Sequence, residues 1–314
     1  FGKWHLGDNY PYRPQDRGFQ QVVAHKGGGV GQTPDYWGNN YFDDTYFHNN
    51  VPKDHDGYCT DIVTDMAVQW LKQKRDPNRP FLLMCQHKAP HRNWMPALRH
   101  LNLYDDIEIP EPATLFDRWE DNAPPARYQE LEIDRHMDLN YDLFVDLTPD
   151  FSGEGIQKRQ DRSAWRNMSR MSPEQLKAWR SAYGPKDKAF HAAHLKGKDL
   201  VRWKFQRYAK NYLRCVRGVD EGVGRLMELL EETGLADNTV VIYCSDQGFY
   251  IGDHGWYDKR WMYEESLKMP FIVKWPGVTK PGSRSQLMIQ NLDYAATFLE
   301  MAGAAIPCDI QGVS

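Results

Sequence analysis

The chain has 314 residues, a pI near 6.3 and a formal net charge of −4, with both signs of charge spread along it. This length suits one large α/β domain, or one domain with a substantial insertion. The balanced charge argues against nucleic acid as a partner, and no stretch approaches the roughly 20 apolar residues of a membrane span.

The 11 Trp and 17 Tyr residues fit either stacking against sugars or filling of a core. Five scattered cysteines have neither zinc-site nor redox-motif spacing. Two of them, Cys85 and Cys244, end expected core strands and are predicted to be buried. The chain starts at Phe1 and stops at Ser314 in what reads as the middle of elements, so we expect a fragment.

The first motif is Gly2–Gly7. If this segment is extended, alternation puts Lys3 and His5 on one face and Trp4 and Leu6 on the other. The polar face would then grip an anionic group. The alternative is an amphipathic edge strand with solvated Lys and His.

Residues 8–58 read as long ordered loops with short strands. The glycine-rich stretch 26–31 superficially resembles a phosphate loop, but it lacks the Gly-Lys-Ser/Thr ending and no helical pattern follows. A helix is predicted over Thr60–Lys74 from its apolar spacing, followed by a buried strand over Pro80–Cys85. Together they form half of a βαβ unit.

The strand delivers a cluster of two imidazoles and two cations, His87, Lys88, His91 and Arg92. Pro90 keeps the residue before it extended and so presents His91 from a stiff segment. A single His here would most often be structural, whereas four such groups favour an anion or metal site.

Residues 101–198 are poor in aliphatic side chains and rich in charge and Pro, so we interpret them as an insertion that caps the sheet edge; a linker is the alternative. Helices are predicted at Arg127–Met137 and Pro173–Tyr183. A long amphipathic helix follows over Leu200–Glu232, ended by Gly234. Its expected buried face comprises Phe205, Tyr208, Tyr212, Val216, Val219, Val223, Leu226 and Leu230. A second stripe, predicted to be solvated, comprises Lys204, Arg207, Lys210, Arg214 and Arg217.

The run Val240–Cys244 is continuously apolar and predicts a strand buried on both faces, as in a parallel sheet. It ends at Asp246 and Gln247, where α/β sheets collect ligands and where oxygen donors suit Ca²⁺ or Mg²⁺. A plain polar turn is the alternative. A second strand, Phe271–Pro276, and a helix, Asp293–Met301, complete the pattern.

Three strand ends therefore present Lys3 and His5, then His87 and His91, then Asp246 and Gln247, with Lys259 following. A divalent ion, imidazoles and ammonium groups around one point suit a tetrahedral dianion or its monoester. An imidazole can also act as general acid for a leaving alcohol.

With these motifs the chain resembles a type I sulfatase of the alkaline phosphatase superfamily. The matching stretches are Gly2–Gly7, Ala89–His91, Ser245–Gly248, Asp258–Arg260 before Tyr263–Glu265, and Asp309–Ser314. The resemblance implies a mostly parallel central sheet flanked by helices, truncated at both ends. It also implies core segments at 1–100 and 199–314 around an insertion at 101–198, with the C-terminal subdomain missing.

The resemblance further implies the site residues. Asp246 and Gln247 would ligate Ca²⁺, although many members have Asn at the second position. Lys3 and Lys259 would hold sulfate oxygens, His5 would act on the nucleophile hydrate, and His91 would protonate the leaving alcohol.

The family's nucleophile is a formylglycine made from the Cys or Ser of a C/S-x-P-S-R motif, and this sequence contains no such motif. That motif and two Asp metal ligands are expected upstream of Phe1, so the chain alone should bind metal poorly and be inactive. The resemblance also implies a periplasmic or secreted protein.

Within the family, the chain resembles bacterial carbohydrate sulfatases that act on 6-O-sulfated N-acetylglucosamine. This implies a sulfated carbohydrate as the partner, with His87, Arg92, Asp253 and His254 binding substrate; ordinary loop capping is the alternative for the last three. A phosphodiester or phosphonate monoester hydrolase, and a catalytically dead sugar-binding protein, remain as other functions.

Overall fold

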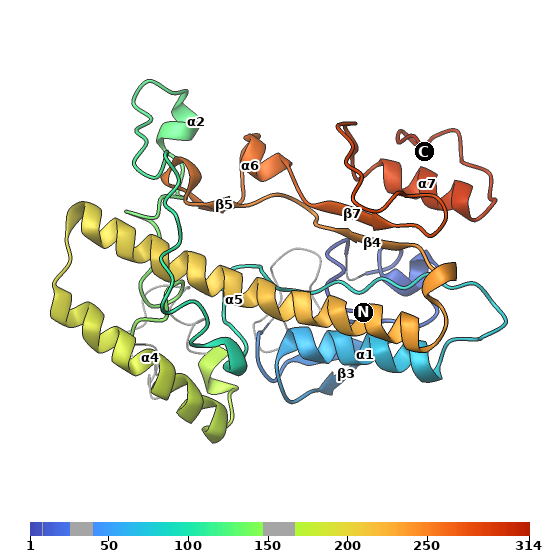
Figure 1. The fold of residues 1–314 in the computed structure, drawn as a ribbon, viewed down its shortest axis with the longest axis horizontal. Helices are drawn as coiled ribbons and strands as arrows, with labels where there is room; N and C mark the ends of the chain where they lie inside the picture. Colours follow the sequence, from blue (N-terminus) through green and yellow to red (C-terminus); the bar gives the residue numbers. More distant parts are fainter. Residues whose placement is uncertain (8, 26–39, 147–166) are drawn as a thin grey trace. The chain divides into compact units, whose positions relative to one another are not determined.

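The computed structural model of the chain describes residues 1–7, 9–25, 40–146 and 167–314 (Figure 1). These residues form two compact units. The first comprises Phe1–Gly234 and Tyr250–Asp258, and the second comprises Leu235–Phe249 and Lys259–Ser314. The glycine-rich stretch 26–31 lies outside the described residues. The predicted boundaries at residues 100 and 198 stay a prediction.

Three segments of the first unit pair in parallel around Gly2. Its backbone bridges Ala24 on one side and Gln86 on the other, with Gly2 N donating to Val23 O at 2.8 Å and Lys3 N to Gln86 O at 2.9 Å. Gly2 has a φ of 104°, and a Cβ there would lie 1.9 Å from Gln86 O, so only glycine permits this approach. The residues that follow the three segments therefore leave from one edge.

One of these three segments, β1 (Val23–Ala24), also belongs to an antiparallel sheet with β2 (Thr45–His48) and β3 (Val51–Asp54). Asn49 and Asn50 join β2 to β3 with φ of 47° and 75°, the conformation that a two-residue hairpin needs. The prediction of loops with short strands is thus confirmed for the described part of residues 8–58.

The predicted buried strand Pro80–Cys85 is wrong, because among the described residues it forms no ladder. The end of this segment pairs with Phe1: the Phe1 amino group donates to Met84 O at 2.7 Å, and Gln86 N donates to Phe1 O at 2.8 Å. Leu82 is 59% exposed. Among the described residues, parallel pairing is limited to the bridges at Gly2, and the named strands pair antiparallel.

The three long predicted helices are confirmed: α1 (Cys59–Gln73), α4 (Pro173–Ala193) and α5 (Gly197–Glu232). A capping box of Ser172 and Gln175 starts α4, which continues ten residues past its predicted end at Tyr183. Figure 1 shows α1 lying along the C-terminal half of α5. Their close approach requires Gly222, where a Cβ would lie 2.6 Å from Thr64 Oγ1.

The predicted helix Arg127–Met137 is wrong, since α2 spans only Pro124–Arg127. Further on, the backbone forms an isolated antiparallel bridge between Glu132 and Trp256, with Ile133 N donating to Gly255 O and Tyr257 N to Leu131 O, both at 2.9 Å. A turn over residues 133–136 follows this bridge. The remaining short elements of this unit are η1 (Pro14–Arg17), η3 (Leu98–His100), β5 (Tyr250–Ile251), η5 (Asp253–Gly255) and β6 (Tyr257–Asp258).

The basic stripe of α5 was predicted to be solvated, and this is wrong for three of its members. Lys204, Arg207 and Arg214 are buried, with 6%, 7% and 1% exposed. Each donates at 2.7–3.0 Å to a backbone carbonyl of the segment that follows residue 100, namely those of Asp134, Leu143 and Leu103. In Figure 1 this green segment crosses α5, to which these hydrogen bonds attach it. The stripe therefore anchors part of the predicted insertion.

The apolar stripe of α5 is buried at Phe205, Tyr208, Val219 and Leu230, and half-buried at its other four predicted positions. Three of the indole rings, those of Trp94, Trp179 and Trp256, are fully buried and fill the core.

The second unit contains η4 (Ala236–Asn238), β4 (Val241–Cys244), α6 (Glu264–Leu267), β7 (Phe271–Lys274) and α7 (Asp293–Met301). Both predicted strands and the helix are confirmed. The prediction that β4 is buried on both faces, and Cys244 with it, is wrong: the residues of β4 are half-buried or exposed. The reason is that, within the described ranges, β4 has β7 as its one strand partner, antiparallel to it. Tyr294 of α7 stacks on Phe271 of β7 at 5.6 Å.

Cys85 is only half-buried rather than buried, and it is a free thiol. None of the described helices combines the length and the apolar character needed to cross a bilayer.

Candidate functional site

Lys3 follows Gly2 directly at the edge of the parallel arrangement and is half-buried. The alternation predicted for the extended segment is wrong, because His5 has a left-handed φ of 61° and Leu6 is 67% exposed. Trp4 anchors the segment, its Nε1–H donating to a backbone carbonyl at 2.8 Å. Lys3 and His5 thus leave the same strand end, but in a turn.

His87 and Lys88 point to opposite sides, as neighbours in an extended segment do. His87 is directed at the helices: its Nε2 lies 3.0 Å from Thr64 Oγ1, and burial lowers its pKa to about 4. Lys88 is 5% exposed, and its Nζ lies 3.8 Å from the centroid of the Tyr41 ring. Burial lowers the pKa of Lys88 to about 8, and the Lys3 ammonium acts in the same direction. Lys88, rather than His87, therefore shares an electrostatic environment with Lys3.

A buried polar pair completes this environment. His25, which follows β1 as Lys3 follows Gly2, has its Nδ1 2.8 Å from Asp44 Oδ2, and both residues are buried. Burial raises the pKa of Asp44, but the bond from His25 and the charge of Lys88 leave it below its ordinary value. The carboxylate is thus ionised and partly balances the cations. Sequence reasoning missed His25, because no individual strand could be placed within residues 8–58.

His91 is held from several directions. Its Nδ1 donates to the carbonyl of Arg92 at 2.6 Å, its backbone N–H donates to Lys88 O at 3.0 Å, and its carbonyl accepts from Tyr41 Oη at 2.6 Å. These bonds fix the imidazole plane and assign the proton of the neutral ring to Nδ1.

Arg92 is part of the same loop. Its guanidinium lies 5.1 Å from the ring centroids of both Tyr141 and Tyr257, and it forms a two-bond ion pair with Asp142. Sequence reasoning missed Asp142, because nothing distinguishes it from the many acidic residues of its region.

Asp253 and His254 make the contacts expected of loop capping. Asp253 Oδ2 accepts from Ile251 N at 3.3 Å, while His254 N–H donates to Thr114 Oγ1 at 2.9 Å. His254 Nδ1 lies 3.2 Å from Asp117 Oδ2. These bonds position both side chains, and their contact with substrate stays a prediction.

In the second unit, Asp246 and Gln247 follow β4 at its carboxyl end, as predicted. Asp246 is exposed, and its backbone carbonyl accepts from Asn291 Nδ2 at 3.4 Å. Gly248 turns the chain under the carbonyl of Glu265, which would lie 2.1 Å from a Cβ there. Lys259 Nζ lies 5.8 Å from the Phe249 ring centroid. The approach of this set to Lys3, His5 and His91 stays a prediction.

A calcium site can be tested on its donors. Asp246 and Gln247 supply a carboxylate and an amide oxygen, which are donors that Ca²⁺ accepts, although it takes six to eight oxygens. Among the described residues, no group of three or more His, Cys, Asp or Glu is placed to hold a metal. The pair fits part of a calcium site only, so no step of chemistry is derived from the ion.

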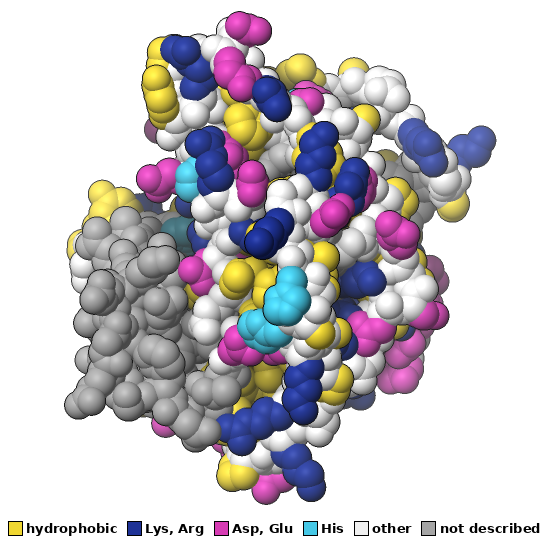
Figure 2. All heavy atoms as spheres, turned by 90° about the vertical axis from the view of Figure 1, so that its left-hand side faces the viewer, with side chains coloured by type: hydrophobic (Ala, Val, Ile, Leu, Met, Phe, Trp, Pro, Cys, Tyr) yellow, Lys and Arg dark blue, Asp and Glu magenta, His cyan; other side chains and the backbone are white. Residues whose placement is uncertain are grey.

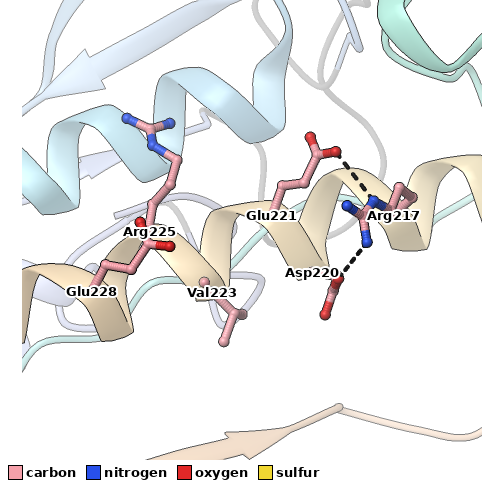
Figure 3. A pocket seen from close by; sticks show the side chains of 7 residues that line it. Arg217, Asp220, Glu221, Val223, Arg225 and Glu228 are labelled. Carbon is pink, nitrogen blue, oxygen red and sulfur yellow. Dashed lines mark hydrogen bonds and ion pairs between the residues drawn. The ribbon is translucent and has the colours of Figure 1, made fainter.

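A hollow of about 590 Å³ on α5 is lined by Arg217, Asp220, Glu221, Val223, Gly224, Arg225 and Glu228. Figure 3 shows how these side chains lie along the helix. Arg217 pairs there with Asp220 at 3.1 Å and with Glu221 at 3.2 Å. None of the predicted site residues lines this hollow, and its charges largely neutralise one another, so it is not part of the candidate site. On the face shown in Figure 2, Lys and Arg side chains are likewise interspersed with Asp and Glu.

The first unit thus gathers Lys3, Lys88 and His25 near one edge of parallel-paired segments, with His91 on the loop that follows. This combination is typical of α/β proteins that bind a tetrahedral anion. A family model described as Sulfatase matches residues 1–304. The chain belongs to the sulfatase family.

Individual relatives agree with this assignment. An N-acetylglucosamine-6-O-sulfatase of Bacteroides thetaiotaomicron is 41% identical over 313 residues, covering 100% of this chain and 53% of the relative. A solved structure described as a complex with its substrate D-glucosamine-2-N,6-O-disulfate matches with a TM-score of 0.88 and 40% identity, covering 100% of this chain and 60% of that one. The likeness confirms the predicted alkaline-phosphatase-like α/β fold class.

A phosphonate monoester hydrolase of Silicibacter pomeroyi also matches, with a TM-score of 0.50 and 22% identity over 81% of this chain and 40% of that one. At this identity the likeness concerns the fold alone. The chain spans about half the length of the curated Bacteroides relative.

Proposed function

We propose that the full-length protein is a sulfuric ester hydrolase that removes the 6-O-sulfate of an N-acetylglucosamine-type sugar. The observation that carries this proposal is the 41% identity to an N-acetylglucosamine-6-O-sulfatase along the whole chain. The lowered pKa of Lys88 supports it, because the Lys3 ammonium contributes to that lowering and a bound sulfate would offset the repulsion between the two cations.

The proposed roles follow from the chemistry of each group. Lys3 and Lys259 hold sulfate oxygens, and His5 acts on the nucleophile. His91 protonates the leaving alcohol: with Nδ1 donating to Arg92 O, the imidazolium form carries its second proton on Nε2 and would transfer that proton to the substrate oxygen.

Sugar recognition is proposed for Arg92, Asp253 and His254. For the sulfate, Lys88 is a better candidate than the predicted His87. The His87 imidazole contacts Thr64 of α1, and its pKa of about 4 keeps it neutral near pH 7.

Two further parts of the proposal concern groups outside this chain. Calcium would be held by Asp246 and Gln247 together with other ligands. The nucleophile would be a formylglycine, whose C/S-x-P-S-R motif does not occur in residues 1–314. We also propose export to the periplasm or the medium, which fractionation of producing cells would test.

The test compares kcat/KM of the full-length protein on N-acetylglucosamine-6-sulfate and N-acetylglucosamine-6-phosphate. We expect the sulfate ester to be preferred by orders of magnitude. Preference for the phosphate would favour a phosphoester or phosphonate hydrolase, and sugar binding without turnover would favour a glycan-binding protein.

A further inference from the structure

The ion pair between Arg92 and Asp142 joins the loop that carries His91 to a segment 50 residues further on. Arg92 Nε donates to Asp142 Oδ1 at 2.6 Å, and Nη2 donates to Oδ2 at 2.7 Å. This is the two-bond geometry in which a guanidinium and a carboxylate hold each other most firmly. A second tie runs parallel to it, since Asn93 Nδ2 donates to Tyr141 O at 3.2 Å.

Asp142 is itself held rigidly. It is fully buried, and its Oδ2 also accepts from the backbone N–H of Asp138 at 2.9 Å. Asp138 in turn accepts from the N–H groups of Asn140 and Tyr141, both at 2.8 Å. Burial raises the pKa of the Asp142 carboxyl, and the Arg92 charge opposes this. The hydrogen bonds within the turn 138–142 therefore hold the Asp142 carboxylate in a fixed orientation.

Arg92 differs from the guanidinium groups that serve packing alone. Its side chain is 22% exposed, compared with 6% for Arg207, which pairs with Asp187 at 2.8 Å. In the described part of the chain, Nη1 of Arg92 makes no hydrogen bond, whereas Nε and Nη2 are both used. Tyr141 and Tyr257 restrict the plane of the guanidinium from their ring faces. One edge of Arg92 is thus clamped while the other can donate to a ligand.

We propose that Asp142 is a positioning residue for sugar recognition: it orients Arg92 so that Nη1 donates to an oxygen of the sulfated sugar. This rests on the proposed function. Asp142 does not touch the substrate and acts only through Arg92. Part of the region interpreted as a capping insertion thereby contributes to the selection of substrate.

The experiment measures kcat/KM of the full-length protein on N-acetylglucosamine-6-sulfate (the sugar) and on an aryl sulfate. Calorimetry gives the Kd of N-acetylglucosamine-6-sulfate. In Asp142→Asn, an amide N–H faces the Arg92 donors and the two-bond pair is lost. We expect kcat/KM for the sugar to fall about 10- to 100-fold, as for loss of a hydrogen bond to a charged group. The aryl ester offers no sugar oxygen, so its kcat/KM should change less than about threefold.

Asp187→Asn is the matched control, because it breaks the other buried Arg–Asp pair of the same region. It should lower the melting temperature and leave the sugar-to-aryl ratio unchanged. The ratio is independent of the folded fraction, so a purely structural effect of Asp142→Asn would leave it unchanged too, and that result overturns the proposal.

A double-mutant cycle with Arg92→Gln checks that the effect passes through Arg92. Asp142→Asn should cause no further fall in the sugar-to-aryl ratio when Arg92 is already Gln; an additional tenfold fall overturns the proposal. This double variant buries no unpaired charge, so it also serves if Asp142→Asn alone does not fold. A wild-type protein that binds the sugar without cleaving it refutes the proposed hydrolysis, while the Kd values still test Asp142. One that neither binds nor cleaves it overturns both.

Discussion

Replacing Lys88 by Met removes an ammonium group that the fold buries almost completely, with 5% of the residue exposed. Burial lowers the pKa of Lys88 from 10.5 to about 8. A fall of about 2.5 in pKa corresponds to roughly 3 kcal/mol of unfolding free energy. That is the stability which the folded protein forgoes by holding this lysine charged.

The sign follows from proton binding in the two states. Below pH 8 the lysine is charged in both the folded and the unfolded chain, and the full penalty applies. Between about pH 8 and 10.5 the folded state releases the proton first, so the unfolding free energy rises with pH. The Lys88→Met variant lacks this contribution. The unfolding free energy of the variant minus that of wild type should therefore decrease by roughly 3 kcal/mol across this pH interval.

Urea unfolding followed by tryptophan fluorescence at pH 7, 8, 9 and 10 measures the difference. If the unfolding free energies of the two proteins change with pH in parallel, the assigned pKa of Lys88 is refuted. Inorganic sulfate at pH 7 adds a second comparison, because an anion next to Lys88 should stabilise wild type more than the variant; equal stabilisation would argue against Lys88 as a sulfate contact.

Lys3→Ala and Lys259→Ala in the full-length protein should each lower kcat on the order of 10²–10³-fold, as for loss of a transition-state contact; near-wild-type kinetics in either would reject its role. His91→Ala should cost more activity on sugar sulfates than on aryl sulfates, because a poor leaving group needs the proton more; equal losses would exclude His91 as the acid. Lys204→Met should destabilise the fold by about 1–3 kcal/mol, since it leaves buried carbonyls without a donor. The half-exposed Lys210→Met is its control, and equal melting temperatures for the two variants would contradict this.

The helices could be predicted because their signal is local. In α5 the apolar spacing alone defines a helix to within a few residues, and Gly234 ends it with a φ of 69°. The strand segments Val241–Cys244 and Phe271–Lys274 were equally visible. Their antiparallel pairing was not, because a continuous apolar run does not specify its partner.

Several errors share one cause, which is that partners distant in the chain leave no mark in a local sequence pattern. Lys204 reads as a solvated cation until its carbonyl partners, more than 60 residues away, are known. His87 and Lys88 are adjacent, and only the orientation of the extended segment decides which side chain reaches the Lys3 environment. Nothing in the local sequence distinguishes Asp142 from other aspartates, and its role becomes apparent only from its ion pair with Arg92.

The central claim is that residues from distant parts of the chain meet around one sulfate group. An experimental structure of the full-length protein with N-acetylglucosamine-6-sulfate tests it most directly. We expect Lys3 Nζ and Lys259 Nζ to lie within about 3 Å of sulfate oxygens, with His91 beside the ester oxygen and Asp246 in the same pocket. A sugar bound elsewhere, or His91 and Lys259 on opposite sides of the molecule, would contradict it.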